Sequence, residues 1–141
     1  MTIRFALEPG LTAEEFRAVL LASTLGERRP VADLPRLETM LRQADLVVTA
    51  RSAGHLVGIS RALTDFAFCC YLSDLAVDVA FQHQGIGKRL IAETHRAAGP
   101  ITSLILVAAP AAEGYYPKIG LQAVKSAWII PRVPEASRQR P

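Results

Sequence analysis

The chain has 141 residues, half of them apolar, and its 16 basic and 13 acidic side chains leave a net charge of only +3. That length suits one globular domain that buries about two-thirds of its unfolded surface. We expect no nucleic acid partner, because the sequence shows neither a basic stripe nor a known nucleic-acid-reading motif.

The sequence also argues against a membrane protein. No uninterrupted apolar run reaches the roughly 18 residues of a membrane-spanning helix. Near the N-terminus the chain has Glu8 where a signal peptide would need a long apolar core. We therefore expect a cytoplasmic protein without a membrane partner.

A metal is not expected either. Cys69 and Cys70 are neighbours in a strand-like stretch, so their side chains point to opposite faces and should not form a disulfide with one another. The histidines lie on separate segments, and no CxxC pair or Cys/His set has the spacing of metal ligands.

The first half of the chain predicts a strand, two helices and a hairpin. The strand at residues 2–7 alternates apolar and polar side chains. A capping box at Thr12–Glu15 opens the first helix, and Asp33 opens the second. Two strands and their connecting turn follow at residues 46–50, 56–62 and 52–54.

The second half begins with a long central strand at residues 67–79. A helix starts at Gly85 and stops at Gly99-Pro100, a common helix end. Residues 101–107 are almost wholly apolar, as in a strand buried on both faces. A short helical segment, a last strand and a loose tail follow at residues 111–119, 121–130 and 132–141.

This order of elements, β, α, α, β, β, β, α, β, α, β, predicts an α/β fold in which helices flank a mixed central sheet. No internal repeat and no interdomain linker is visible. We expect one domain over residues 1–131 and a flexible C-terminal tail over residues 132–141.

A strand, a glycine-containing loop and a helix succeed one another in the stretch Leu72–Leu90. Gly85 and Gly87 stand where the helix begins, and the first N–H groups of a helix have no partner within it. Together with the helix dipole, such amides form an anion site. Lys88 and Arg89 add positive charge in the first turn, which favours a phosphate-bearing ligand over a simple turn.

Two well-known phosphate loops do not fit these residues. The dinucleotide-binding pattern needs a third glycine where the chain has Leu90. A P-loop needs Ser or Thr where the chain has Arg89, and an earlier glycine where it has Gln82.

The loop does resemble the pyrophosphate loop of the GNAT superfamily of acyl-CoA N-acyltransferases. The family pattern, Gln/Arg-x-x-Gly-x-Gly/Ala, corresponds to Gln82, Gly85 and Gly87, after a strand that ends in an apolar triplet at residues 75–77. A second stretch, at residues 115–121, resembles the family segment in which a short helix leads into the next strand. The resemblance extends over nearly the whole chain, to residue 131.

This resemblance implies an enzyme that moves an acetyl group from acetyl-CoA to a primary amine by direct attack of the amine. It implies that Tyr116 acts as general acid and protonates the departing CoA thiolate. It also implies that the central strand splays from the next strand, so that its backbone bonds the pantetheine arm and aims one N–H at the oxyanion. The implied cofactor-binding residues are Leu75, Ala76 and Val77 for pantetheine, and Gln82, His83, Gln84, Gly85, Ile86, Gly87 and Lys88 for pyrophosphate.

The pattern does not identify a general base. Asp74 is a suspect, because a carboxylate in an apolar strand is costly unless it is paired. A hydrogen bond that Asp74 accepts from a loop backbone would explain it equally well. Two positions depart from the family pattern: Ala109 replaces an asparagine that helps to hold the CoA arm, and Leu121 replaces a phenylalanine.

Two other functions are compatible with the same fold. A non-catalytic acyl-CoA-binding or regulatory domain would keep the glycine loop without needing the Tyr116 hydroxyl. A protein-interaction module would use Tyr115, Tyr116 and Trp128 as a partner surface and would not bind CoA. No motif specifies the acceptor, a small-molecule or peptide amine, and the apolar residues 128–130 raise a homodimer as a further expectation.

Overall fold

The computed structural model describes residues 2–134, which fall into two compact units, one that ends at Val107 and one that begins at Ala108. The first unit holds a five-stranded mixed sheet in the order β1-β2-β3-β4-β5, which confirms the predicted fold class. Neighbouring strands are antiparallel, except that β4 and β5 are parallel. The strands span Ile3–Leu7 (β1), Leu46–Ser52 (β2), His55–Thr64 (β3), Cys69–Val77 (β4) and Ser103–Ile105 (β5).

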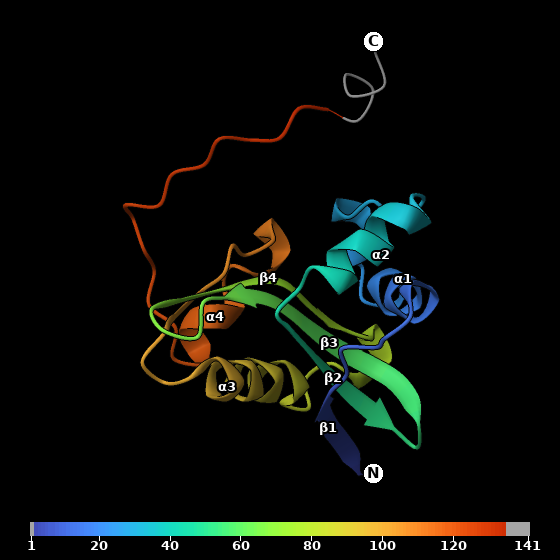
Figure 1. Cartoon of the computed structure of the whole chain (residues 1–141). Helices are drawn as coiled ribbons and strands as arrows, with labels where there is room; N and C mark the ends of the chain where they lie inside the picture. Colours follow the sequence, from blue (N-terminus) through green and yellow to red (C-terminus); the bar gives the residue numbers. More distant parts are fainter. Residues whose placement is uncertain (1, 135–141) are drawn as a thin grey trace. The chain divides into compact units, whose positions relative to one another are not determined.

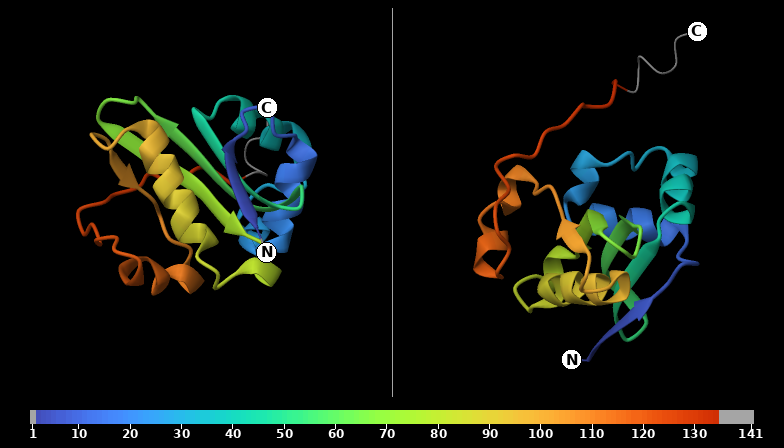
Figure 2. Two further views of the ribbon diagram at one scale, coloured as in Figure 1. Left: turned by 90° about the horizontal axis from the view of Figure 1, so that it is seen from below. Right: turned by 60° about the vertical axis from the view of Figure 1, so that its left-hand side comes forward.

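Helices cover both faces of this sheet. Helices α1 and α2 lie against one face and α3 lies against the other (Figure 1). The left view of Figure 2 shows α3 lying along the sheet. The helices span Ala13–Ala22 (α1), Leu34–Arg42 (α2) and Ile86–Ala98 (α3), and two short 3-10 turns span Leu25–Arg28 (η1) and Val79–Phe81 (η2).

The predicted helix ends are confirmed by their capping interactions. The Thr12 side chain accepts the backbone N–H of Glu15 at 3.1 Å, and the Asp33 side chain accepts that of Arg36 at 3.1 Å. Helix α3 stops at Gly99, whose φ of +105° is readily adopted only by glycine. Each of these three signals involves residues close together in the sequence, so the sequence alone is enough to predict it.

Apolar clusters attach the helices to the sheet. On the face of α3, Ile86 and Leu90 pack with Val48 and Val57 of the sheet. Gly58 of β3 permits this close approach, because a Cβ there would lie 3.1 Å from a Leu90 methyl carbon and 3.3 Å from one of Ile86. On the opposite face the cluster includes Phe16, Leu20, Leu37, Leu41, Ile59 and Ala76, each no more than 2 % exposed.

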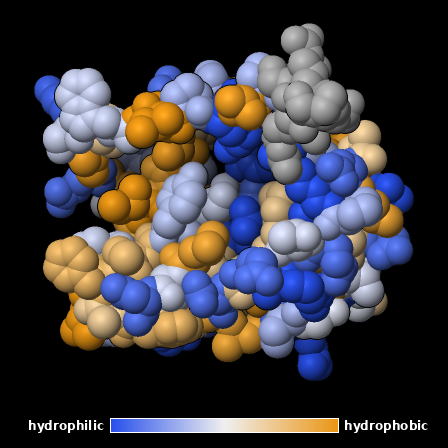
Figure 3. Space-filling view, turned by 45° about the horizontal axis from the view of Figure 1, so that its top comes forward, coloured by the Kyte–Doolittle hydropathy of each residue, from blue (hydrophilic) through white to orange (hydrophobic). Residues whose placement is uncertain are grey.

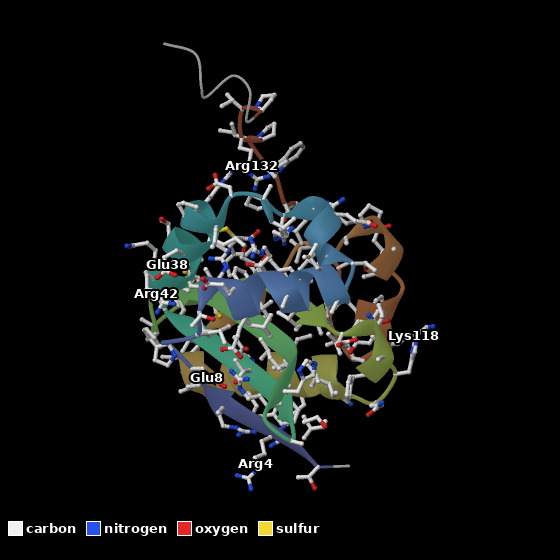
Figure 4. All side chains as sticks on the ribbon, turned by 90° about the vertical axis from the view of Figure 1, so that its right-hand side faces the viewer. Arg4, Glu8, Glu38, Arg42, Lys118 and Arg132 are labelled. Carbon is white, nitrogen blue, oxygen red and sulfur yellow. The ribbon has the colours of Figure 1, made fainter. Side chains whose placement is uncertain are left out.

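Polar contacts join the second helix to the chain before the first. Arg42 of α2 forms an ion pair with Glu38 one turn earlier, at 2.7 Å, and both lie on the same side of the helix (Figure 4). Arg42 also donates to the carbonyl oxygens of Pro9, at 2.8 Å, and Leu11. The connection between β1 and α1 is therefore held against α2.

The central strand is shorter than predicted. Residues 67–79 were expected to be extended, but β4 spans only Cys69–Val77. Before it, the Asp65 carboxylate accepts the backbone N–H groups of Ala67, Phe68 and Cys69 and closes a turn. After it, Asp78 caps the η2 turn by accepting the N–H of Ala80 at 2.9 Å.

The strand predicted at residues 101–107 is present, but its predicted length and burial are wrong. The segment 101–107 forms only the three-residue strand β5, and Ile101 and Val107 are 74 % and 70 % exposed instead of buried. In the described sheet β5 has a neighbour on one side only. Apolar composition indicates a strand, but it does not set the length of the strand, and its side chains are buried only where other elements cover both faces of the sheet.

The second unit contains little regular structure. The predicted helical segment 111–119 is split into η3 (Pro110–Ala112) and the four-residue helix α4 (Tyr115–Lys118). The predicted strand 121–130 is wrong, because residues 121–134 contain no strand. Trp128 and Ile130 are 92 % and 97 % exposed. On the face of the molecule drawn in Figure 3, apolar residues lie beside hydrophilic ones at the surface.

The prediction of one domain over residues 1–131 stays a prediction. In the expected tail, residues 132–134 have no regular structure, and residues 135–141 lie outside the described part of the chain. None of the helices within residues 2–134 combines the length and hydrophobicity of a membrane span.

A buried ion cluster links β4 to its surroundings. Asp74 of β4 is fully buried and accepts the Nε–H of Arg29 with one carboxylate oxygen and that of Arg61 with the other. Arg29 also donates to the Ser73 carbonyl at 2.8 Å, and Arg61 donates to the Ser73 hydroxyl at 3.0 Å and to the Met40 carbonyl at 3.3 Å. The cluster therefore joins β3, β4, the end of α2 and the segment after η1.

We expect Asp74→Asn to destabilise the protein by about 3–5 kcal/mol, because two guanidinium groups would then lack their carboxylate. Urea unfolding measures the free energy of unfolding directly. Asp78→Asn is the matched control, since an asparagine oxygen can still cap η2, and its effect should stay within about 0.5 kcal/mol. Similar losses for both variants would contradict a special role of the buried cluster.

Candidate active site

The loop between η2 and α3 presents backbone amides at the start of the helix. The first helical hydrogen bond of α3 runs from the Arg89 N–H to the Gly85 carbonyl, at 3.1 Å. The preceding amides, of Ile86, Gly87 and Lys88, therefore lack a carbonyl from an earlier helical turn. Gly85 has a φ of +80°, and a Cβ built there would meet no atom within 4 Å. The space beside Gly85, where the helix begins, is therefore open.

The side chain of Gln82 attaches this loop to the central strand. Its Nε2 group donates to the Val77 carbonyl, at 3.1 Å, and so joins the first loop residue to the last residue of β4. His83 adopts a φ of +65°, a conformation that is uncommon outside glycine and recurs at functional sites. Gln82, His83 and Gln84 are all exposed.

The two cations of the first helical turn have different surroundings. Arg89 forms an ion pair with Glu93 at 2.7 Å and lies over the Phe5 ring, 4.7 Å from its centroid. The Arg89 guanidinium thereby lowers the pKa of the Glu93 carboxyl. Lys88 is exposed and makes no ion pair within residues 2–134. Lys88 is therefore the better placed of the two to bind a phosphate.

Strand β4 has the unpaired edge that the family resemblance implied. Its pairing with β5 covers only Cys69–Tyr71, whereas its pairing with β3 continues to Val77. Within the described sheet, Leu75, Ala76 and Val77 thus have no strand neighbour on the β5 side. Their side chains anchor the strand, since Leu75 and Val77 pack in the α3 cluster and Ala76 in the cluster on the other face.

Tyr116 lies in the second unit, on α4. The helix ends as predicted, with Gly120 at the position after the cap and a φ of +98°. Tyr116 is half-buried, and its ring meets that of Tyr115 edge to face, with centroids 5.3 Å apart. Burial raises the pKa of the Tyr116 hydroxyl above its usual value of 10, and Tyr115 adds to the effect. The hydroxyl is therefore protonated at neutral pH and can donate.

The environment of Asp74 favours a structural role over that of a general base. Both of its oxygens accept from arginines and its side chain has no exposure, so an amine has no access to it. The sequence offered a loop backbone as the alternative partner, whereas the partners are Arg29 and Arg61. These lie 45 and 13 residues away along the chain, and no spacing pattern could have found them.

A surface cavity of about 510 Å³ lies at the β3–β4 turn. Three backbone N–H groups donate to the Asp65 carboxylate and lower the pKa of this carboxyl to about 2, and the bond from Phe68 has the largest effect. Asp45 accepts the Thr64 N–H at 2.8 Å, so both acidic residues stabilise the turn. Among the described residues no group of three or more His, Cys, Asp or Glu side chains could hold a metal. The cavity is lined by Asp45, Leu63, Thr64, Asp65, Cys69, Cys70, Tyr71 and Ile105.

The fold is shared by several acetyltransferase structures. The protein SA2161 of meticillin-resistant Staphylococcus aureus, called a probable acetyltransferase, superposes with a TM-score of 0.78 at 18% identity, over 94% of this chain and 100% of that one. A GNAT-family acetyltransferase from Streptococcus pneumoniae gives 0.73 at 20% identity, over 93% and 100%. An aminoglycoside N-acetyltransferase in complex with CoA gives 0.71 at 18% identity, over 93% and 95%.

The sequence comparison identifies the family. A family model described as the acetyltransferase (GNAT) domain matches residues 29–128, which is more than half of the chain and includes both motifs, the glycine loop and the Tyr116 segment. The resemblance inferred from those motifs is thereby confirmed. The chain belongs to the acetyltransferase (GNAT) domain family and is an acyl-CoA-dependent N-acyltransferase.

Proposed function

We propose that this enzyme transfers an acetyl group from acetyl-CoA to a primary amine by direct attack. The observation that carries the proposal is the hydrogen bond between Gln82 and the Val77 carbonyl. This bond joins the amide loop to the end of β4. The loop amides suit a pyrophosphate, and the unpaired edge of β4 suits the amides of a pantetheine arm. An acyl-CoA molecule needs both in this order, because its pantetheine arm extends from the pyrophosphate.

The same residues account for the chemistry. The amine nitrogen attacks the thioester carbonyl, a C–N bond forms, and a backbone N–H of residues 75–77 stabilises the oxyanion. The C–S bond then breaks, and the Tyr116 hydroxyl donates its proton to the CoA thiolate. The proton lost by the amine goes to water and Tyr116 is reprotonated from solvent, so no covalent intermediate on the protein is needed.

We propose a small-molecule or peptide amine as the acceptor. One of the structures with the same fold is an aminoglycoside N-acetyltransferase, which supports a small-molecule amine. The homodimer is proposed on the exposed apolar residues Trp128, Ile129 and Ile130, which a second subunit could cover. The cytoplasmic location stays a prediction of the sequence.

We expect Gly85→Glu to weaken acetyl-CoA binding at least about tenfold, because a carboxylate would be placed beside the pyrophosphate. Gly54→Glu is a closely matched control. Gly54 has a φ of +84° against +80° for Gly85, and a Cβ added at either position would meet no atom within 4 Å. Calorimetric titration with acetyl-CoA should therefore show weak binding for Gly85→Glu and ordinary binding for Gly54→Glu.

The same titration separates the rival functions. If the wild type does not bind acetyl-CoA, the acetyltransferase proposal fails and the protein-interaction module becomes the better hypothesis. If it binds and both glycine variants lose affinity equally, backbone strain, and not the loop, explains the loss.

We expect Tyr116→Phe to lower kcat by about 10²–10⁴-fold without changing the Kd for acetyl-CoA, because only the proton donor is removed. Tyr115→Phe, at the neighbouring ring, should leave kcat close to that of the wild type. Steady-state rates of CoA release, measured with one saturating amine, provide the comparison. Full activity of Tyr116→Phe would remove the tyrosine from the mechanism, and loss of activity in both variants would indicate a structural role for the ring pair.

A further inference from the structure

The Asp74 cluster contains more positive than negative charge. The side chains of Arg29 and Arg61 are 22 % and 9 % exposed, and that of Asp74 is 0 % exposed. Within residues 2–134, Asp74 is the only carboxylate that pairs with either arginine. Charged side chains are seldom buried without a partner, so the net charge of +1 favours an anion beside the cluster.

Arg29 has hydrogen-bonding capacity to spare. A guanidinium carries five N–H groups. Within the described residues, three N–H groups of Arg29 donate hydrogen bonds: one to Asp74, one to the Ser73 carbonyl at 2.8 Å and one to the Arg28 carbonyl at 2.8 Å. One N–H remains on each terminal nitrogen, at the end of the planar fork that matches a carboxylate or a phosphate. Arg29 is also the more exposed of the two arginines, so a ligand reaches it first.

This arginine reaches β4 beside the proposed cofactor strand. Ser73 is the extra residue of a bulge, since Asp74 pairs with Arg61 and Leu72 with Ala62. A strand rises about 3.3 Å per residue, so the Ser73 carbonyl lies roughly 7 Å before Leu75. Consider a molecule that binds Arg29 through an anionic group and carries an amine a few bonds from that group. Its amine would lie near Leu75, where the thioester is proposed to lie.

We propose that Arg29 binds an anionic group of the acceptor, and that the acceptor is an amine that also carries a carboxylate or a phosphate. This inference rests on the proposed function, because it assumes that the acceptor meets the thioester at β4. It predicts a preference opposite to that for a polycationic amine such as an aminoglycoside. The acidic residues of the cavity do not set the charge of the acceptor, because Asp45 and Asp65 already accept backbone N–H groups of the turn.

The test compares amines with and without an anionic group. Primary amines are supplied with acetyl-CoA in matched sets: an amino acid, its amide and its decarboxylated form; phosphoethanolamine and ethanolamine; and one aminoglycoside. Mass spectrometry measures the acetylated products. We expect the anionic members to be acetylated with a kcat/KM at least roughly tenfold above that of their neutral partners, as for a hydrogen bond to a charged group. The carboxylate and phosphate sets show which anion is preferred.

Two variants assign this preference to Arg29. Arg29→Gln leaves Arg61 and Asp74 as a neutral pair, so the variant should fold, which thermal unfolding verifies. It should acetylate the anionic and neutral amines at similar rates. Arg28→Gln is the matched control, because Arg28 is an exposed neighbour that contributes only its backbone carbonyl to Arg29, and it should keep the wild-type preference.

A second readout does not depend on acetylation. The wild type, saturated with CoA, is titrated with glutarate at millimolar concentration and followed by NMR. Binding that is lost in Arg29→Gln and kept in Arg28→Gln supports the anion site even if no acceptor in the set reacts. If neutral or polycationic amines are acetylated in preference to anionic ones, the anion site at Arg29 is overturned, whereas the proposed acetyltransferase function is retained. The absence of both glutarate binding and an anionic preference also overturns it, and the acetyl-CoA titration then decides the proposed function separately.

Discussion

The candidate site depends on how far strand β4 is paired. Strand β3 pairs with it as far as Val77, whereas β5 pairs with it only over Cys69–Tyr71. Backbone N–H and C=O groups that have no strand partner must find another one, because burying them unpaired is costly. Apart from the Ser73 and Val77 carbonyls, which accept from Arg29 and Gln82, the edge of β4 from Leu72 onward can therefore offer its main-chain groups to a ligand. The Gln82 side chain attaches the amide loop to the end of that same edge.

Buried charge is the second feature that shapes this region. Asp74 lies on the central strand, where a general base would be expected, yet both of its oxygens accept hydrogen bonds from Arg29 and Arg61. The cluster connects β4 to β3 and, through the Met40 carbonyl, to α2. It has a structural role through Asp74 and a proposed binding role through the excess charge of Arg29. The two roles are compatible, because removing Arg29 leaves a neutral ion pair whereas removing Asp74 leaves two unpaired cations.

The success of the sequence-based predictions followed the range of the interactions involved. Thr12, Asp33 and Gly99 were identified as helix ends because capping acts over a few residues. The strand predicted at residues 101–107 is limited to Ser103–Ile105, and residues 121–130 form no strand, because apolar composition indicates strand propensity but does not supply a neighbouring strand. The surroundings of Asp74 were missed for a similar reason, since its partners come from distant segments of the chain.

The amino-acid sequence by itself determined the family, the mixed α/β fold, the amide loop at the start of α3 and the position of Tyr116. All of these depend on short-range patterns of glycine, polar caps and apolar periodicity. The tertiary structure alone decided where the pairing of β4 with β5 ends, that Arg89 lies over the Phe5 ring, and that Asp74 lies between two arginines. These features depend on which residues meet when the chain is compact, and contacts across many residues leave no periodic signal in the sequence.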